Sequence, residues 1–413
     1  MANKYTRLLK NTGIVFVGNA GSKLLLFLML PFYTRYLGPT EYGVSDLIVT
    51  YATMLLGLVT CQIQDAVFVF PKGETYSRQQ QHFSSGLVFL LGSYIVCGLG
   101  IFVVSGFFSR GAFFRQYSGL IVSVLFLNGL HQYLQQFCRA VDRMVTYALS
   151  GLGLTLIVVL LSIWLIPAYP TGRVLGLIQC AGFAGGIVIS LLGARLWHYF
   201  RHGAFSRASL VNLLKYAIPL VPTAVMWWAL TGLNRPFLER YCSLAAVGFY
   251  AAAIKLPSIL GVGWSVIGNA WQISVLEEYR EPGFVRYFWS FFGILACGVI
   301  AVVLVLTVGS TFFMRFLVGP EYYSVSKFIP LLSLGAGFSV LAGSIGALYA
   351  ASRKSKYFFY SSLWAVGSVI AFNAVLIPRF GLWGAAWANM LSMAVELVVR
   401  LCYGLKLLKE VAR

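Results

Sequence analysis

The sequence predicts an all-α integral membrane protein of about 12 transmembrane helices in two six-helix lobes, and three observations support this. Hydrophobic residues make up 59% of the 413 positions, charged residues only 10%, and the mean hydropathy is +0.81. A soluble domain carries roughly 25% charged residues, so most of these helices must face lipid or one another. Apolar runs recur throughout the chain, and one short motif is written twice, about half the chain apart.

Twelve segments have the roughly 20 mainly apolar residues that cross a bilayer. We expect spans near 12–33, 43–66, 83–108, 117–138, 145–166, 174–197, 213–235, 245–272, 288–313, 324–350, 357–377 and 383–405. The first is basic and then apolar, like a secretory signal, but Lys23 interrupts it and no cleavage site follows. We therefore expect it to be a retained first span. Prolines are expected to bend spans 7, 8 and 10, at Pro219, Pro222, Pro257 and Pro330.

The basic residues predict the orientation. With both termini in the cytoplasm, most lysines and arginines of the loops and span ends lie on that side, Arg400 among them, as the positive-inside rule requires. The opposite side holds eight basic residues, and none of these eight is a lysine. They are Arg35, Arg110, Arg115, Arg173, Arg235, Arg240, Arg315 and Arg379. We expect a multi-pass protein of the bacterial inner (plasma) membrane.

The duplicated motif reads PFYTRYLGPTEYG from Pro31 and PFLERYCSLAAVG from Pro236. Five residues recur at an offset of 205: Pro31/Pro236, Phe32/Phe237, Arg35/Arg240, Tyr36/Tyr241 and Gly43/Gly248. A second short repeat, LIP, occurs at 165–167 and 376–378, so that each copy follows one copy of the first motif along the chain. We interpret the chain as an N-lobe, 1–207, and a C-lobe, 208–413. With six spans in each, the lobes should be related by an axis along the membrane normal.

Arg35 and Arg240 therefore occupy equivalent places, where the first and seventh spans reach the outer face. Two interpretations stay open. Each arginine either anchors its helix in the aromatic belt beside Tyr and Phe, or stands at the mouth of a cavity shared by the lobes.

Two lysines are expected near the bilayer midplane, where a charge costs roughly 2.5–3.5 kcal/mol on insertion scales. Lys23 lies about 11 residues, or ~16 Å, into span 1, and Lys255 about 10 residues, or ~15 Å, into span 8. Each lysine either forms a salt bridge or extends its ammonium group to the membrane surface, or the two bind an anionic ligand. We favour an anionic substrate, with Asn19, Thr53 and Asn269 as further substrate-binding residues on polar helix faces.

Polar residues recur at helical spacing on three spans, which predicts a wet, cationic cavity. Span 2 carries Asp46, Thr50, Thr53, Gly57, Thr60 and Gln64; span 4 carries Asn128, His131, Gln135 and Arg139; and span 8 carries Lys255, Ser258, Ser265, Asn269 and Gln272. Hydrogen bonding between helices is the alternative explanation.

Three carboxylates lie within the spans, and we expect at least one of Asp46, Asp65 and Glu396 to carry a coupling proton or sodium ion. Their alternative roles are helix capping or pairing with loop arginines.

The sequence contains no recognisable set of catalytic residues. Walker A, HExxH and GxSxG motifs are absent, and the scattered cysteines and four histidines show no metal-ligand spacing. We therefore expect no enzyme activity, no cofactor and no metal. The basic residues are not clustered in a polar domain, so no nucleic-acid partner is expected.

FLMLPFYTRYLGPTEYGVSDL, DAVFVFP at 65–71 and GLWGAAWANML near the end resemble bacterial polysaccharide-unit (O-antigen, Wzx-type) flippases. These belong to the multidrug/oligosaccharidyl-lipid/polysaccharide exporter superfamily. The resemblance implies a V-shaped transporter with a central cavity. It also implies that the chain moves an undecaprenyl-diphosphate-linked oligosaccharide from the inner to the outer leaflet by alternating access, among membrane lipids and other polysaccharide assembly proteins.

Two alternatives stay open. A multidrug antiporter for organic cations would need central carboxylates, whereas the central charges here are lysines. An integral-membrane glycosyltransferase or polymerase would need a sizeable outer loop with catalytic residues, and the connections are short.

Overall fold

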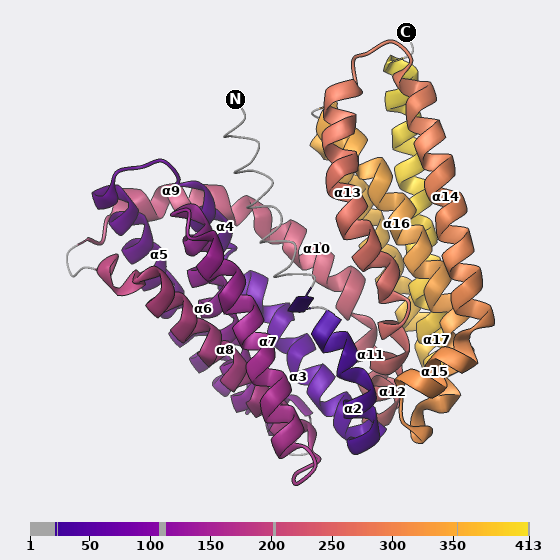
Figure 1. Ribbon diagram of the computed structural model, residues 1–413, viewed down its shortest axis with the longest axis horizontal. Coiled ribbons are helices and arrows are strands. Elements are labelled where there is room, and N and C mark those ends of the chain that lie inside the picture. Colours follow the sequence, from indigo (N-terminus) through magenta and orange to yellow (C-terminus); the bar gives the residue numbers. More distant parts are fainter. Residues whose placement is uncertain (1–20, 23, 107–112, 201–203, 353, 412–413) are drawn as a thin grey trace. The chain divides into compact units, whose positions relative to one another are not determined.

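The computed structural model describes residues 21–22, 24–106, 113–200, 204–352 and 354–411 (Figure 1). Over these ranges every regular element is a helix, and nine helical stretches are long and apolar enough to cross a membrane. The prediction of an all-α membrane protein is therefore confirmed.

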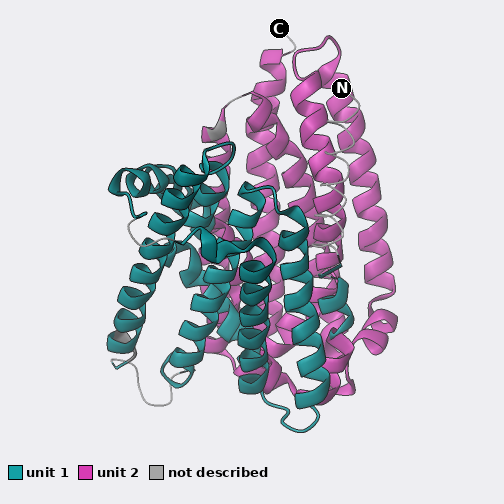
Figure 2. Cartoon of the chain, turned by 60° about the vertical axis from the view of Figure 1, so that its left-hand side comes forward, with its two compact units in different colours: residues 1–29, 44–225 teal, residues 30–43, 226–413 magenta. Residues whose placement is uncertain are grey.

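The chain forms two compact units, shown in teal and magenta in Figure 2. The N-terminal unit comprises residues 1–29 and 44–225, and the C-terminal unit comprises residues 30–43 and 226–413. The first copy of the duplicated motif thus packs within the same unit as the second copy.

The N-terminal unit contains α3 (Pro39–Val59), α4 (Ile63–Val69), α5 (Tyr76–Ser105), α6 (Phe113–Ala140), α7 (Met144–Leu165), α8 (Gly172–Ala194), η1 (Leu196–His198), α9 (Arg207–Ala217) and η2 (Ile218–Leu220). The first residues of α3, up to Gly43, belong to the C-terminal unit. Local sequence explains several ends. Thr171 and Ser206 cap α8 and α9, each accepting a hydrogen bond from the backbone three residues on. Helix α8 stops where Arg195 adopts left-handed backbone.

The connection between the halves is tied to the start of α5. Ser85 Oγ accepts a hydrogen bond from the Ser206 amide at 2.9 Å, and Tyr76 and Gln80 donate to the His198 carbonyl oxygen. Nearby, the Tyr133 hydroxyl donates to the Phe83 carbonyl oxygen at 2.6 Å inside a cluster of aromatic rings.

The C-terminal unit contains α2 (Leu30–Tyr36), most of α10 (Val221–Gly232), α11 (Asn234–Tyr241), α12 (Leu244–Lys255), α13 (Ser258–Glu278), α14 (Phe284–Val308), α15 (Ser310–Leu317), η3 (Pro320–Phe328), α16 (Ile329–Ala351) and α17 (Ser355–Val411). Its main core gathers on Trp271, Val275, Phe288, Leu348 and Leu407. Helices α13, α16 and α17 run side by side around it.

Each predicted span has helical residues in its described part, with bounds shifted by a few residues. Spans 11 and 12 are the two arms of α17, which bends where Gly381 takes φ 56° and ψ −126° just after Pro378. The first LIP tripeptide lies at the C-terminal end of α7, and the second lies just before the bend of α17.

Two expectations about individual spans are wrong. Span 2 is not one straight helix, because Cys61 and Gln62 adopt left-handed backbone and separate α3 from α4. Pro330 does not bend span 10, because it lies in the first turn of α16, where a proline needs no hydrogen-bonded amide. Pro257, in contrast, separates α12 from α13, as expected.

Candidate functional site

A cavity of about 350 Å³, lined by both polar and apolar side chains, lies within the C-terminal unit. Its walls are α13, α16, both arms of α17 and one residue of α10. It is lined by Trp227, Trp264, Ser265, Gly268, Asn269, Trp271, Gln272, Ser339, Gly343, Gly346, Ala347, Phe358, Glu396 and Arg400. The cavity brings together two residues predicted from sequence, Asn269 and Glu396.

A buried ion pair forms one side of this cavity. Arg400 Nη2 lies 2.6 Å from Glu396 Oε1, and the two side chains are only 7% and 5% exposed. Arg400 Nη1 also donates to the Ala342 carbonyl oxygen at 3.0 Å, and the guanidinium lies over the Phe358 ring at 4.8 Å. Arg400 is therefore a buried side chain, whose charge is compensated inside the protein by the carboxylate one turn earlier on the same helix. That it lies on the cytoplasmic side of the membrane stays a prediction.

Indole rings form a second side. Trp271 Nε1 donates to the Ser344 carbonyl oxygen at 2.9 Å, and its ring stacks on Phe291 with centroids 3.6 Å apart. Trp264 lies against two glycines, since a Cβ at Gly343 would come within 2.7 Å of its Nε1. A Cβ at Gly268 would likewise come within 2.9 Å of the same ring. These glycines make the room that the indole occupies.

Helix α13 presents its predicted polar face to this cavity through Ser265, Asn269 and Gln272, all exposed. Asn269 Nδ2 donates to the Ser265 carbonyl oxygen at 3.0 Å, which fixes the orientation of the amide. The spacing therefore predicted the shared polar face, but the cavity that this face lines lies within the C-terminal unit. A cavity shared by the two lobes stays a prediction.

Lys255 lies on the same predicted span but at its break. It is the last residue of α12 and is exposed, and α13 starts at Ser258, whose hydroxyl donates to the Lys255 carbonyl oxygen at 2.6 Å. Because Pro257 has no amide hydrogen, the last turn of α12 keeps carbonyl groups that the helix does not satisfy. A cation at a helix C-terminus is electrostatically favoured. Asn19 and Lys23 lie outside the described residues.

In the N-terminal unit, Asp46 and Thr53 lie on α3, and both are partly buried. The Thr53 hydroxyl donates to the Val49 carbonyl oxygen at 2.8 Å, and Thr50 donates to the Asp46 carbonyl oxygen at 2.7 Å. Asp65 lies in the first turn of α4, on the other side of the break, and interacts electrostatically with Arg139 of α6. The polar face predicted for span 2 is therefore divided between two helices.

The polar residues of span 4 are largely used inside the N-terminal unit. Gln135 Nε2 donates to the Tyr147 carbonyl oxygen at 3.1 Å, and Arg139 donates to Gln136 and stacks on Phe68. His131 is buried, and its Nε2 has no hydrogen-bond partner among the described residues. For Gln135 and Arg139, helix-to-helix contact replaces the cavity we expected.

Arg35 and Arg240 have equivalent local settings. Each lies in the last turn of a short helix, α2 or α11, and each is exposed. The recurring aromatic residues accompany them, with Phe32 against Tyr36 and Phe237 against Tyr241.

Sequence reasoning missed a buried amide cluster in the C-terminal unit. Asn373 Nδ2 donates to Asn234 Oδ1 at 2.8 Å, and Asn234 Nδ2 lies 2.6 Å from the Tyr250 hydroxyl. These side chains come from α17, α11 and α12, and lone asparagines in apolar segments gave no spacing signal. The only available hint was that Asn234 lies two residues before the second motif.

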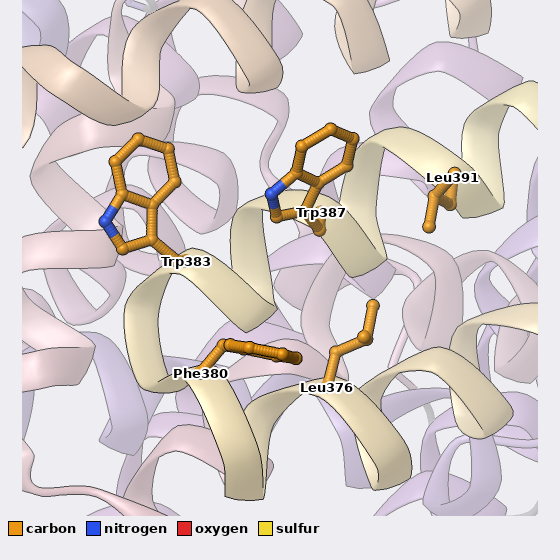
Figure 3. Close-up of a pocket in the computed structure, with 5 residues that line it drawn as sticks. All are labelled: Leu376, Phe380, Trp383, Trp387 and Leu391. Atoms are coloured by element: carbon orange, nitrogen blue, oxygen red, sulfur yellow. The ribbon is translucent and has the colours of Figure 1, made fainter.

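A second cavity, of about 410 Å³, is lined by apolar side chains at the bend of α17 (Figure 3). Its residues are Leu376, Phe380, Trp383, Trp387 and Leu391. It offers no charged group to a polar ligand, so it does not suit a diphosphate. Over the described ranges, no three His, Cys, Asp or Glu side chains are grouped as metal ligands.

Comparison with known proteins gives a family and a fold. Residues 8–272 match the model of the family described as "Polysaccharide biosynthesis protein". A search of curated proteins found no match. Among solved structures, an inward-facing multidrug resistance transporter of the MATE family, in the MOP superfamily, has a TM-score of 0.73 at 12% identity, covering 94% of this chain and 95% of that one.

The lipid II flippase MurJ, in an inward closed conformation, has a TM-score of 0.74 at 13% identity, covering 96% of this chain and 89% of that one. The MATE multidrug transporter DinF-BH has a TM-score of 0.63 at 15% identity, covering 97% of this chain and 95% of that one. At these identities the likeness establishes the shared transporter fold.

Proposed function

Since the chain belongs to the polysaccharide biosynthesis protein family, we propose that it is a flippase for an undecaprenyl-diphosphate-linked glycan repeat unit. It moves this unit from the inner to the outer leaflet of the bacterial inner membrane by alternating access. The chain works as an N-lobe, 1–207, and a C-lobe, 208–413, with both termini cytoplasmic. The glycan is of the O-antigen type found in lipopolysaccharide.

The observation that carries this proposal is Lys255 at the break of its span. An exposed ammonium group at the end of α12 suits a diphosphate, whose oxygens accept charge-assisted hydrogen bonds. Discontinuous spans are where membrane transporters bind ions and substrates. Lys23 is proposed as the second cation and Asn19 and Thr53 as further substrate-binding residues, while Arg35 and Arg240 receive the substrate at the outer mouth.

A multidrug antiporter for organic cations fits this site less well. The carboxylate in the cavity, Glu396, is already neutralised by Arg400 at 2.6 Å, so a cationic drug would have to displace a buried partner. Asp46 and Asp65 remain as carboxylates that take a coupling proton or sodium ion.

The test combines cells with purified protein. Deleting the gene should leave the lipid-linked unit on the inner leaflet and remove surface glycan, and the wild-type chain should restore it. Vesicles containing the protein should make fluorescent undecaprenyl-diphosphate-linked oligosaccharide accessible to a membrane-impermeant quencher. Normal surface glycan in the deletion strain and no flipping in vesicles would contradict the proposal.

A further inference from the structure

The cavity beside Glu396 combines three kinds of chemistry. It has the indole rings of Trp227 and Trp264, amide and hydroxyl groups from α13 and α16, and an ion pair. We propose that this cavity binds a sugar ring of the transported glycan, with the saccharide, not the lipid or the diphosphate, as its ligand. This inference rests on the proposed function and names the part of the substrate that the C-terminal unit recognises.

The charge of the cavity excludes two other classes of ligand. Glu396 and Arg400 are the two charged side chains of its lining, and at 2.6 Å they cancel each other. A bare cation or anion would gain no net attraction there, and it would lose its hydration. A neutral ligand with many hydroxyl groups escapes that penalty because it replaces water with protein hydrogen bonds.

The aromatic walls suit the carbon face of a pyranose ring. A sugar ring has an apolar C–H face and a polar rim, so it packs on an indole while its hydroxyl groups remain free. Trp264 packs closely against Gly268 and Gly343, because a Cβ at either position would come within 2.9 Å of its ring. This close packing limits the freedom of the ring before a ligand arrives, which lowers the ordering cost of binding. Trp271 is buried, donates to Ser344 and stacks on Phe291, so it supports the wall and offers no free face.

The polar side chains of the cavity provide both hydrogen-bond donors and acceptors for the hydroxyl groups at the rim of a sugar ring. An amide side chain can donate and accept, and a hydroxyl can do both. Asn269 and Gln272 supply amides one turn apart on α13, and Ser339 supplies a hydroxyl from α16. Arg400 Nε is buried and has no hydrogen-bond partner among the described residues. The volume of about 350 Å³ falls at the lower end of small-molecule sites.

The position along the span fits a substrate with a phosphate end and a sugar end. Ser265 lies ten residues after Lys255, past the break at Pro257, so the two residues lie on consecutive helices of one span. The diphosphate at Lys255 and a sugar in the cavity would thus be bound by neighbouring parts of the same span.

The test is a photo-crosslinking experiment that works whatever the sugar is. A photoreactive phenylalanine analogue is placed at Ser339 or, in a second variant, at Gln272, in a full-length chain that still restores surface glycan. After irradiation of intact cells, the crosslinked peptide is fragmented by mass spectrometry. We expect sugar-derived oxonium ions from both positions. The matched control is Trp364, which is 63% exposed on α17 and does not line the cavity, and it should give none.

Two outcomes would overturn the inference in cells that export glycan. One is an adduct with the mass of lipid alone, and the other is no adduct at either position. A second measurement compares flipping of undecaprenyl diphosphate with and without its glycan. Asn269→Ala with Gln272→Ala should slow the glycan-bearing lipid about tenfold, as expected for losing one to two hydrogen bonds, and should leave the bare lipid unchanged. Equal slowing of both would overturn the inference while leaving the flippase function intact.

Discussion

Gly43 and Gly248 lie against each other in a reciprocal contact, although they are 205 residues apart in the sequence. A Cβ at Gly43 would fall on the Leu244 carbonyl oxygen and come within 2.9 Å of the Gly248 amide nitrogen. A Cβ at Gly248 would fall on the Pro39 carbonyl oxygen and come within 3.0 Å of the Gly43 amide nitrogen. The two copies of the motif therefore cross with local two-fold symmetry, and their shared glycine is what permits the crossing.

Alanine at either glycine should separate α3 from α12. The obstacle is backbone, which cannot rotate away as a side chain can, so we expect each of Gly43→Ala and Gly248→Ala to lower stability by about 1–3 kcal/mol. Thermal unfolding of the purified protein in detergent measures this. Gly298→Ala on α14 is the matched control, because a Cβ there meets nothing within 4 Å. If all three variants unfold at the same temperature, the crossing does not constrain the fold.

The duplicated motif also shows how far the sequence could lead. Its spacing predicted equivalent corners, and hydropathy predicted the spans, because both depend on local patterns. The sequence did not indicate that the first copy packs within the C-terminal unit. That placement depends on contacts such as the Gly319 amide donating to Thr34 Oγ1 at 3.0 Å and Tyr322 donating to the Leu37 carbonyl oxygen.

The candidate site was predictable in the same partial way. Helical spacing picked out Asn269 on α13, and Glu396 was singled out as a carboxylate within a span. The indoles were not, because an apolar segment conceals which tryptophans face a cavity. The sequence did not show that Arg400 pairs with Glu396 inside the protein, because a spacing of four residues on a helix does not reveal burial. The break after Val59 was missed because neither Cys61 nor Gln62 is a residue that usually signals left-handed backbone.

Removing Arg400 should be far more damaging than removing an exposed cation of the same unit. Arg400→Ala leaves the Glu396 carboxylate buried without its partner, and breaking a buried pair typically costs about 3–5 kcal/mol. Lys354→Ala removes the partner of Glu410 at a pair that is largely exposed, and we expect no measurable change. Glu396→Gln combined with Arg400→Met should recover part of the loss, because no isolated charge remains. A double variant as unstable as Arg400→Ala would argue against the ion pair as the cause.

Lys255 should be required for transport without being required for folding. Because its side chain is exposed at the end of α12, Lys255→Ala should unfold near the wild-type temperature but restore little surface glycan. Lys255→Arg should retain part of the activity, since it keeps the charge. Lys356→Ala, an exposed lysine at the start of α17, is the control. Full export by a Lys23→Ala/Lys255→Ala double variant, at matched protein levels, would refute diphosphate binding by these lysines.

Arg35 and Arg240 should behave alike. Each lies in the last turn of a short helix that also contains the Pro-Phe pair of the motif, so Arg35→Gln and Arg240→Gln should lower export by similar factors. Surface glycan at matched expression is the measurement. Loss of export in one variant and normal export in the other would show that the shared motif does not reflect a shared role. Normal export in both would favour the interfacial anchor.

The driving force of transport gives the last prediction. A diphosphate diester carries about two negative charges, and moving one charge is worth about 2.3 kcal/mol per 100 mV. With a negative interior, outward movement of the bare anion is therefore downhill by about 4–5 kcal/mol per 100 mV. Lysines that move with the substrate would cancel most of that gain, so the return step needs another source of energy.

We expect a proton or sodium ion, bound by Asp46 or Asp65, to supply that energy. Glu396 is a poorer candidate because Arg400 already holds its carboxylate at 2.6 Å. The protein in vesicles is given a potential, a proton gradient or a sodium gradient separately. One ion gradient should accelerate flipping, and Asp46→Asn or Asp65→Asn should abolish that acceleration. Glu396→Gln combined with Arg400→Met, which leaves no isolated buried charge, should keep it. If the potential alone drives flipping at full rate and all three variants match the wild type, these carboxylates do not couple an ion to transport.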